Sequence, residues 1–481
     1  MAREVLRQTR WPPDLFAALF DLLDANTVWQ SVQNIFIPAN RDPLSISDEE
    51  ATLRGRLKLP HGPSTKWEVS ETFCELALSA INDMEQWIAQ VPRLNPVNSE
   101  FPRRIAYLAR AIDVEAIDLS LHRKSLLCDK FQEAHDLLHE KQTFTRIATG
   151  RVIPAAARCA RGNAARKFFK YLLRISPGTD NFVSYRIGSS LSKHKAGEPL
   201  RIGVIPTVQH RDEVSWGLSS GRYTVSLNSK HESKVIRRVI RGLEWLLTEE
   251  AHVIIIPELV SSELLRNAVS CWLRDKAPND PLLILCGSEA VKSDSATGRT
   301  NRAFVVGASG RPLWTQDKNH QYALNAKQIG TCGLQRVLGR EDRNEISTSM
   351  RSEVVICDLL GSGRFSVFVC EDFARDEPGL QALRTFEVDM GVVAVMDGQF
   401  TPGEWRQRGA HTFAQEPGSR IAIGNSRALI SRLSDRDRRN AKVDDLANYT
   451  LPNHGVTQAR WFPNGPLSRA IALLIAPEVK I

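Results

Sequence analysis

The spacing of hydrophobic residues changes near residue 195. Before that point, apolar residues recur every three or four positions, as in Phe73, Ala77, Ala80, Ile81 and Met84. This is the spacing of one buried face of an amphipathic helix. A second stretch, 127–138, has the same spacing. The pattern predicts that residues 1–175 form a mainly α-helical N-terminal domain.

From about residue 199, short apolar runs alternate with helical patterns. Alternating strands and helices are typical of a layered α/β domain, so we expect one over residues 199–481. Residues 176–198 contain Pro177, Gly178 and Gly197 and are expected to form a linker. The predicted strands cover 200–205, 252–256, 282–286, 302–306, 311–316, 354–358, 364–370, 391–396 and 420–424. The predicted helices cover 233–249, 262–274, 379–388 and 405–415.

Composition favours a globular protein with two or three domains. Of 481 residues, 42% are hydrophobic and 25% are charged, which is enough apolar material for a sizeable core. Residues 1–20 carry charges throughout, which argues against a signal peptide. No uncharged stretch has the length of a transmembrane helix. We therefore expect a cytoplasmic protein that does not contact the membrane.

Cysteine and histidine spacing does not predict a metal site. The eight cysteines contain no C-x-x-C motif, so a zinc knuckle or a thioredoxin motif is not indicated. His135 and His139 have a spacing that can hold zinc on one helical face. However, Asp136 follows the first histidine where an H-E-x-x-H motif needs glutamate, and no third ligand is evident.

The N-terminal domain ends in a basic segment. Residues 142–175 contain eight Arg or Lys residues and no Asp or Glu, within a chain whose formal net charge is +8. Such a segment can bind nucleic acid or an acidic protein partner. A solvated helix face above an apolar face explains the same charges. Both interpretations stay open on the sequence.

Three ionisable residues stand at the ends of predicted strands. Glu258 follows 252–256 and Pro257, Lys318 follows 311–316, and Cys370 ends 364–370. An α/β fold can bring strand ends to one rim of a sheet. Taken singly, each also fits a bland role: a turn acid, a solvated hairpin lysine and a buried structural cysteine.

Together these three residues could perform covalent acyl transfer. A cysteine attacks as the thiolate, so Cys370 needs a base or a nearby positive charge. A partly buried carboxylate such as Glu258 can accept the thiol proton. A lysine ammonium such as Lys318 could stabilise the oxyanion that forms when a carbonyl or nitrile carbon is attacked. The sequence thus predicts a Glu-Lys-Cys triad.

Residues 199–481 resemble the nitrilase, or carbon–nitrogen hydrolase, superfamily. The resemblance rests on Ile256-Pro257-Glu258, on Asp317-Lys318-Asn319-His320 after a strand that begins near Asn301, and on Val369-Cys370-Glu371-Asp372. Trp405, Arg408, Glu416 and Asn425 occupy matching later places.

The resemblance implies a four-layer αββα sandwich that forms homodimers or higher oligomers and needs no metal or organic cofactor. It implies cleavage of a non-peptide C–N bond in a carboxamide, carbamoyl or nitrile group through a thioester on Cys370. Glu258 would be the base, Lys318 would stabilise the oxyanion, and the backbone amide of Glu371 would complete the oxyanion site.

The sequence departs from the family pattern at two places. The family usually has an assisting glutamate between the lysine and the cysteine, and Glu341 is the best match, although Glu345 is close. Residues 397–400, Asp-Gly-Gln-Phe, replace a more usual Pro-Ser or Asn segment. Together they suggest either an unusual substrate, still a small-molecule amide or nitrile, or a specialised member.

Two other functions remain open on the sequence. An acyltransferase would use the same triad but an amine acceptor in place of water. Alternatively, a nitrilase-like module could serve as an effector or scaffold of a larger assembly, for example in bacterial anti-phage defence. In that case the basic N-terminal domain would bind a protein partner or nucleic acid.

Overall fold

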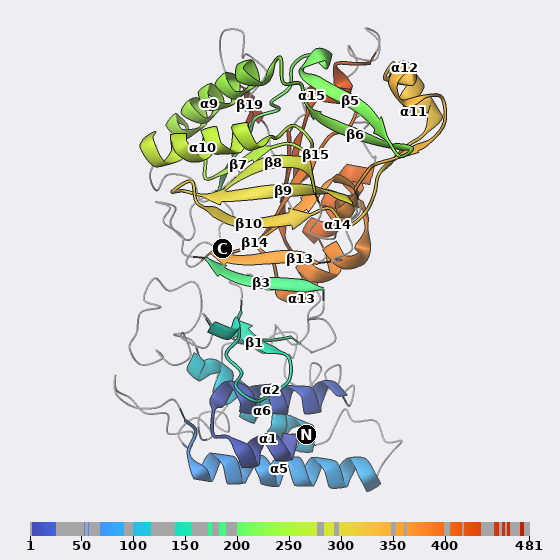
Figure 1. Cartoon of the computed structure of the whole chain (residues 1–481). Coiled ribbons are helices and arrows are strands. Elements are labelled where there is room, and N and C mark those ends of the chain that lie inside the picture. The colour runs from blue at the N-terminus through green and yellow to red at the C-terminus, as the bar shows by residue number, and fades with distance from the viewer. Residues whose placement is uncertain are drawn as a thin grey trace. The chain divides into compact units, whose positions relative to one another are not determined.

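The computed structural model forms two compact units, residues 1–181 and 182–481, which we describe separately (Figure 1). The described residues are 2–25, 52, 56, 68–90, 100–116, 140–155, 172–175, 182–188, 200–276, 283–292, 298–347, 353–359, 363–398, 405–415, 418–433, 447–451, 455–456, 459–461 and 472–475.

The first unit is mainly helical in the residues that the structure describes. Its helices are α1 (Ala2–Gln8), α2 (Pro12–Ala25), α5 (Glu71–Gln90) and α6 (Glu100–Glu115). The spacing of Phe73, Ala77 and Met84 predicted α5, and these side chains are buried in it. The expected helix at 127–138, the His135/His139 pair and residues 156–171 of the basic segment lie outside the described residues.

A short antiparallel sheet adds to these helices. Strand β1 (Arg151–Pro154) pairs with β2 (Leu172–Ile175), which the helical pattern of 1–175 did not predict. The buried carboxylate of Asp14, in the first turn of α2, accepts backbone N–H groups from Arg146 and Ala148, each at 3.0 Å. This connects α2 to the segment just before β1.

The second unit contains two seven-stranded sheets. The first sheet has the order β10-β9-β8-β7-β4-β20-β19. Within it, β4, β7 and β8 are parallel, and the outer pairings are antiparallel. Its strands are β4 (Arg201–Val204), β7 (Val253–Ile256), β8 (Leu283–Lys292), β9 (Arg299–Gly307), β10 (Pro312–Asp317), β19 (Ala459–Trp461) and β20 (Ala472–Ile475).

The second sheet has the order β18-β17-β16-β15-β14-β13-β3. Strands β14, β15 and β16 are parallel, and β13 is antiparallel to β14 but parallel to β3. Its strands are β3 (Val183–Gly188), β13 (Val354–Leu359), β14 (Gly363–Val369), β15 (Met390–Val395), β16 (Arg420–Asn425), β17 (Ala447–Leu451) and β18 (Gly455–Val456).

Strand β3 corrects the expected linker at 176–198. It lies within that range, yet it pairs with β13 along its whole length. Its alternation explains the pairing, because Val183 and Tyr185 are buried while Arg186 is exposed. The prolines and glycines on either side of this strand are typical of a linker, although the short run between them alternates as a strand does.

The two sheets face each other, with helices on their outer sides (Figure 1). In β7, Ile254 and Ile256 point to the helices, whereas Ile255 points to the second sheet. A Cβ atom at Gly424 of β16 would lie 2.6 Å from Ile255 Cγ2, so this glycine permits the close approach of the two sheets. Because both faces of β7 are buried, its sequence is a continuous apolar run and does not alternate with polar residues.

Two pairs of helices cover the sheets. Helices α9 (Glu232–Thr248) and α10 (Glu263–Lys276) share one core with Ile254 and Ile256 of the first sheet. Helices α13 (Gln381–Phe386) and α14 (Trp405–Gln415) belong to the second sheet's side, where Phe413 of α14 packs against Phe368 of β14. The unit is therefore a mixed α/β fold, as the alternating pattern predicted.

The remaining elements connect the sheets or extend beyond their edges. No described helix has both the length and the apolar content that spanning a bilayer requires. The elements outside the two sheets and the helices that cover them are η5 (Arg211–Glu213), β5 (Val214–Ser219), β6 (Arg222–Leu227), β11 (Ala323–Leu324), α11 (Ala326–Thr331), α12 (Gln335–Leu338), β12 (Arg343–Asn344), η6 (Cys370–Ala374), η7 (Asp376–Leu380) and α15 (Arg427–Ile430).

Candidate active site

Three strand ends carry the residues that the sequence singled out. Glu258 stands two residues after β7, Lys318 directly after β10 and Cys370 directly after β14. Strand β8 is parallel to β7. Strand β9 is antiparallel to β8, and β10 is antiparallel to β9, so β10 runs in the same direction as β7. The carboxyl ends of β7 and β10 therefore lie at the same edge of the first sheet, and β14 supplies the third residue from the facing sheet.

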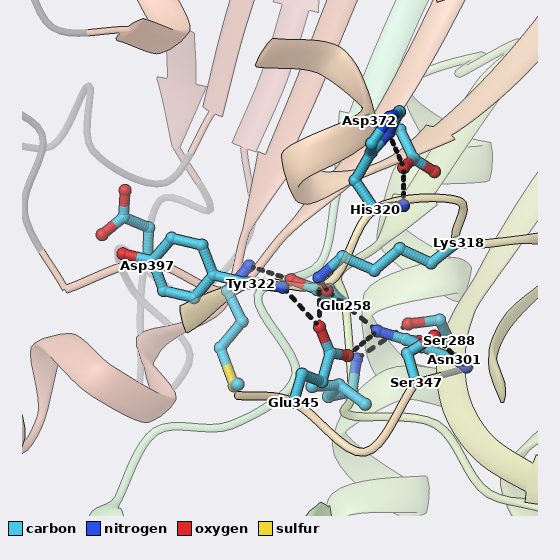
Figure 2. Close-up of polar contacts among 12 residues, drawn as sticks. Glu258, Ser288, Asn301, Lys318, His320, Tyr322, Glu345, Ser347, Asp372 and Asp397 are labelled. Atoms are coloured by element: carbon cyan, nitrogen blue, oxygen red, sulfur yellow. Dashed lines mark hydrogen bonds and ion pairs between the residues drawn. The ribbon is translucent and has the colours of Figure 1, made fainter. Parts of the chain in front are cut away.

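Lys318 lies between two carboxylates (Figure 2). Its Nζ is 2.8 Å from Glu258 Oε1 and 2.6 Å from Glu345 Oε2, and all three side chains are almost fully buried. Burial lowers the pKa of Lys318, but the attraction of Glu258 and Glu345 outweighs it and holds this pKa well above its usual range. The lysine thus remains a cation in a site that excludes water.

Glu258 has a hydrogen-bond donor at each carboxylate oxygen. Oε1 accepts from Lys318 and from Asn301 Nδ2 at 2.9 Å, and Oε2 accepts from the backbone N–H of Met396 at 3.0 Å. The charge of Glu258 raises the pKa of the buried Cys370 thiol, so the two groups lie near each other. Burial raises the pKa of Glu258 to about 6, although Lys318 acts in the opposite direction. A carboxylate with this pKa can both take and return a proton near neutral pH.

Cys370 occupies a constrained turn. It has a φ of 47°, in the left-handed region that non-glycine residues rarely adopt, where β14 changes into η6. Such a conformation costs on the order of 1–3 kcal/mol and is found mainly where the surroundings fix it, often at functional sites. The turn places a buried cysteine at the end of a buried strand, near Glu258 and Lys318.

The Cys370 thiol stays protonated in this environment. Burial raises its pKa well above the usual value, the negative charge of Glu258 raises it further, and Lys318 only partly offsets both. The site therefore holds no preformed thiolate. A nucleophilic role requires that Glu258 remove the proton as the sulfur attacks.

Glu345, not Glu341, joins Lys318. The side chain of Glu341 is 80% exposed and pairs with Arg343 at 3.2 Å, so the sequence match that favoured it is wrong in position. The pairing of β11 with β12 sets Glu345 beside Tyr322, whose carbonyl accepts the Glu345 N–H at 2.9 Å. The two glutamates are four residues apart, and the sequence contains no signal that shows which of them lies beside Lys318.

Asn301 is a member of the cluster to which the sequence assigned no role. Its side-chain amide donates to Glu258 Oε1 at 2.9 Å and to Glu345 Oε1 at 2.7 Å. One Nδ2 group thus bridges both carboxylates that flank Lys318 (Figure 2). Its place at the start of β9, near the lysine motif, was the only available signal.

Asp372 connects the cysteine turn to the lysine loop. Its buried carboxylate accepts the backbone N–H of His320 at 2.7 Å, the backbone N–H of Asn319 at 2.9 Å, and contacts His320 Nδ1 at 3.0 Å. Burial raises the pKa of Asp372, and the hydrogen bond from His320 lowers it. The contacts fix the loop after Lys318 relative to η6, and they place His320 beside Asp372.

The side chain of Glu371 forms an ion pair beside the cysteine turn. Its carboxylate pairs with Arg375 at 2.6 Å on the first turn after Cys370. The predicted contribution of Glu371 was its backbone amide, which follows the nucleophile directly and does not depend on the side chain. That contribution stays a prediction.

A pocket of about 210 Å³ adjoins the cluster. Tyr322 and Asp397 connect the pocket to the cluster, because Tyr322 N donates to Glu345 Oε2 at 3.4 Å and Met396, just before Asp397, donates to Glu258 (Figure 2). The lining residues are Tyr322, Leu324, Asn325, Lys327, Gln328, Thr331, Cys332, Asp397, Gly398, Leu429 and Leu433. Within the described part of the chain, no group of three His, Cys, Asp or Glu residues could hold a metal ion.

Comparison with known proteins found solved structures that match this chain with low TM-scores. No protein-family model matches the chain, and no curated protein matches it. An amidase from Nesterenkonia sp. has a TM-score of 0.37 at 13% identity, over 59% of this chain and 92% of that one. A mutant of the Nesterenkonia AN1 amidase, described as from the nitrilase superfamily, has a TM-score of 0.36 at 13% identity, over 59% and 92%.

A further mutant of that amidase shows the result of Michael addition of acrylamide at the active-site cysteine. It has a TM-score of 0.36 at 13% identity, over 58% of this chain and 93% of the other.

Proposed function

We propose that this protein is a carbon–nitrogen hydrolase of the nitrilase type. Its substrate would be a carboxamide, carbamoyl or nitrile compound, cleaved through a thioester on Cys370. The observation that carries the proposal is the buried Lys318 ammonium between Glu258 and Glu345, with the buried Cys370 close enough for the charges of Glu258 and Lys318 to act on its pKa. The two facing sheets with their outer helices are consistent with a four-layer αββα sandwich.

The first half of the reaction on a carboxamide forms the thioester. As Cys370 Sγ attacks the carbonyl carbon, Glu258 accepts the thiol proton. The carbonyl oxygen becomes an oxyanion, which the Lys318 ammonium and the backbone N–H of Glu371 stabilise. The tetrahedral adduct then collapses: the C–N bond breaks, the nitrogen leaves with the proton from Glu258, and the thioester remains.

The second half returns the enzyme to its starting state. A water molecule attacks the thioester carbon and gives a proton to Glu258, and a second oxyanion forms at the same place. The C–S bond then breaks, the acid leaves, and the sulfur regains the proton. In each half of the reaction Glu258 accepts one proton and then donates it. A pKa of about 6 suits both steps near neutral pH.

The role proposed for Glu345 follows from charge balance. A lone ammonium is costly to bury, and Glu258 neutralises it only while it is ionised. Glu345 supplies a carboxylate that stays with Lys318 at 2.6 Å when Glu258 is protonated. In that step the Lys318–Glu345 pair is neutral overall, so Glu258 can hold the proton without leaving an unpaired buried charge.

Intact-mass spectrometry with a panel of small amides and nitriles tests this function. We expect a mass increase equal to the acyl fragment on the native chain and its absence in Cys370→Ala. Cys271→Ala is the matched control, because Cys271 is an exposed free cysteine outside the site and its loss should leave the adduct intact. An adduct that persists in Cys370→Ala, or no adduct and no product with any member of the panel, would exclude the mechanism.

A further inference from the structure

Asn301 makes hydrogen bonds to three of the segments that build the cluster (Figure 2). Its backbone N–H donates to Ser347 Oγ at 3.2 Å, two residues after Glu345, and its carbonyl accepts the N–H of Lys318 at 2.8 Å. Its side-chain Nδ2 donates to Glu258 Oε1 at 2.9 Å and to Glu345 Oε1 at 2.7 Å. The main chain thus fixes the place from which this amide reaches both carboxylates.

The side-chain amide of Asn301 is held in one orientation. Nδ2 faces two carboxylate oxygens, and the reverse orientation would set the carbonyl oxygen Oδ1 against two negative charges. Oδ1 is buried and accepts no hydrogen bond from the residues that the structure describes. The missing bond at Oδ1 is tolerated because hydrogen bonds to ionised groups are roughly twice as strong as neutral ones. Both donor hydrogens of Asn301 therefore serve the two glutamates.

The two oxygens of the Glu258 carboxylate have different surroundings. Oε1 accepts from Asn301 Nδ2 and from Lys318 Nζ, which together occupy its two lone-pair sites. Oε2 accepts from the backbone N–H of Met396 at 3.0 Å, which occupies one site. A proton that reaches Glu258 is therefore added at the second site of Oε2.

Glu345 is the neighbour that can compete with Glu258 for this proton. Burial raises the pKa of the Cys370 thiol and of the nearby Tyr223 phenol well above their usual values. Burial lowers the pKa of Lys318, but the two carboxylates outweigh it and hold this pKa well above its usual range. Two adjacent carboxylates tend to share one proton, because like charges disfavour each other, and a hydrogen-bond donor to each favours the ionised form of both.

We propose that Asn301 is a positioning residue for the base. By donating to both glutamates it keeps them ionised side by side around Lys318. Together with Lys318 it also occupies Oε1 of Glu258, so that Oε2 takes the proton of Cys370. The inference rests on the proposed function in one respect, since it takes Glu258 as the base. Asn301 acts through the two carboxylates and is assigned no contact with the reacting atoms.

The Met396 N–H is a reporter of the proton on Glu258 Oε2. The chain contains five methionines, so 15N-labelled methionine gives few amide signals in an NMR spectrum of the full chain, and Met396→Leu identifies the one required. Burial raises the pKa of Glu258 to about 6. As the pH falls through that value, protonation of Oε2 should weaken the hydrogen bond and move the Met396 amide proton to lower frequency. Met84, in α5 of the first unit, is the internal reference.

Removal of the Asn301 amide should shift this titration. Asn301→Leu keeps the branched shape without a donor, and the midpoint of the Met396 signal should rise by about one to two pH units, the size of one lost hydrogen bond to a charged group. Asn301→Ser, whose side chain is too short to bridge both carboxylates, should shift it in the same direction. Thr300→Val is the matched control, because Thr300 is equally buried in β9 and its side chain lies on the opposite face of the strand. It should keep the native midpoint.

Three results would overturn the inference. A native Met396 signal that does not titrate would exclude Oε2 as the oxygen that takes the proton. A titration that persists in Glu258→Gln would belong to another group, such as Glu345 or the adjacent Asp397, and not to the base. A native midpoint in both Asn301→Leu and Asn301→Ser would leave Asn301 only a structural residue.

The NMR titration is independent of the proposed function, because it requires no substrate and no turnover. If Cys370 forms no acyl adduct with any amide or nitrile while the Met396 signal titrates and shifts as expected, the proposed function fails and the effect of Asn301 on Glu258 stands. If acyl adducts form but the midpoint does not depend on Asn301, the hydrolase assignment stands and the role of Asn301 is excluded.

Discussion

Lys318 Nζ lies 2.8 Å from Glu258 Oε1, with both side chains almost fully removed from water. Glu258 follows β7 and Lys318 follows β10, so this contact joins the ends of two strands of the first sheet between which β8 and β9 lie. Because Glu345 binds the same ammonium at 2.6 Å, the lysine keeps a partner whichever way Glu258 is protonated. The cluster can therefore move one proton without creating an isolated charge, and the predictions below follow from it.

Reaction at Cys370 should depend on the ionisation of Glu258. Burial raises the pKa of Glu258 to about 6, so the fraction of ionised base increases as the pH rises through that value. Acyl-adduct formation on Cys370 should increase over the same range and then level off. A pH series of single-turnover rates measures this. Glu258→Gln should abolish the step; a native rate that is flat between pH 5 and 7 would contradict the assignment.

The contribution of Glu258 to the free energy of unfolding should fall over the pH range in which the reaction rate rises. Its pKa is about 6 in the folded chain and has an ordinary value of 4.5, so the folded state binds more protons between these values. The Glu258 contribution to the free energy of unfolding therefore falls as pH rises from about 4.5 to about 6 and is constant above. Urea unfolding of the native chain and of Glu258→Gln across this range should show the extra downward slope only in the native chain.

Glu345 and Glu341 form a matched pair of variants. Glu345→Gln removes one buried partner of Lys318, which typically costs about 3–5 kcal/mol in a buried pair and should also strongly reduce turnover. Glu341→Gln changes a side chain that is 80% exposed and should alter neither property. Chemical denaturation and steady-state kinetics on both variants check this. Equal effects would contradict the placement of Glu345.

Asp372 should act as a positioning residue. Asp372→Asn weakens the hydrogen bonds that fix Asn319 and His320, so Lys318 would be held less firmly relative to Cys370. We expect kcat to fall while KM changes little, because Asp372 does not line the pocket. Asp376→Asn, at an exposed position of the next turn, is the control. A change in KM alone would argue for a substrate contact instead.

Tyr185 provides a test of β3 as part of the second sheet. Its hydroxyl hydrogen-bonds the fully buried carboxylate of Asp358, which also accepts from Arg364 Nε at 2.9 Å. Tyr185→Phe leaves that carboxylate one donor short and should lower the free energy of unfolding by about 1–3 kcal/mol. Ser184→Ala, on the opposite side of the strand, should have a small effect. Thermal unfolding of the full chain measures both.

The sequence by itself determined most elements of the mixed α/β unit and the residues at the strand ends. Continuous apolar runs such as 252–256 and the helical spacing of 233–249 are local signals, and the corresponding elements β7 and α9 lie where they were predicted. The same local signals placed Glu258, Lys318 and Cys370 within two residues of strand ends. The roles of these residues, the assembly state, the partner of the basic segment and the cellular location stay predictions.

Only the tertiary structure decided which of these residues meet and in what charge state. Glu345 replaces Glu341 because the β11–β12 register, not the distance along the chain, sets which carboxylate faces Lys318. Strand β3 belongs to a sheet because β13, more than 160 residues away, offers it a free edge. The raised pKa of the Cys370 thiol likewise arises from burial beside Glu258. Strand pairing and desolvation join distant parts of the chain, so no local pattern of residues could have specified them.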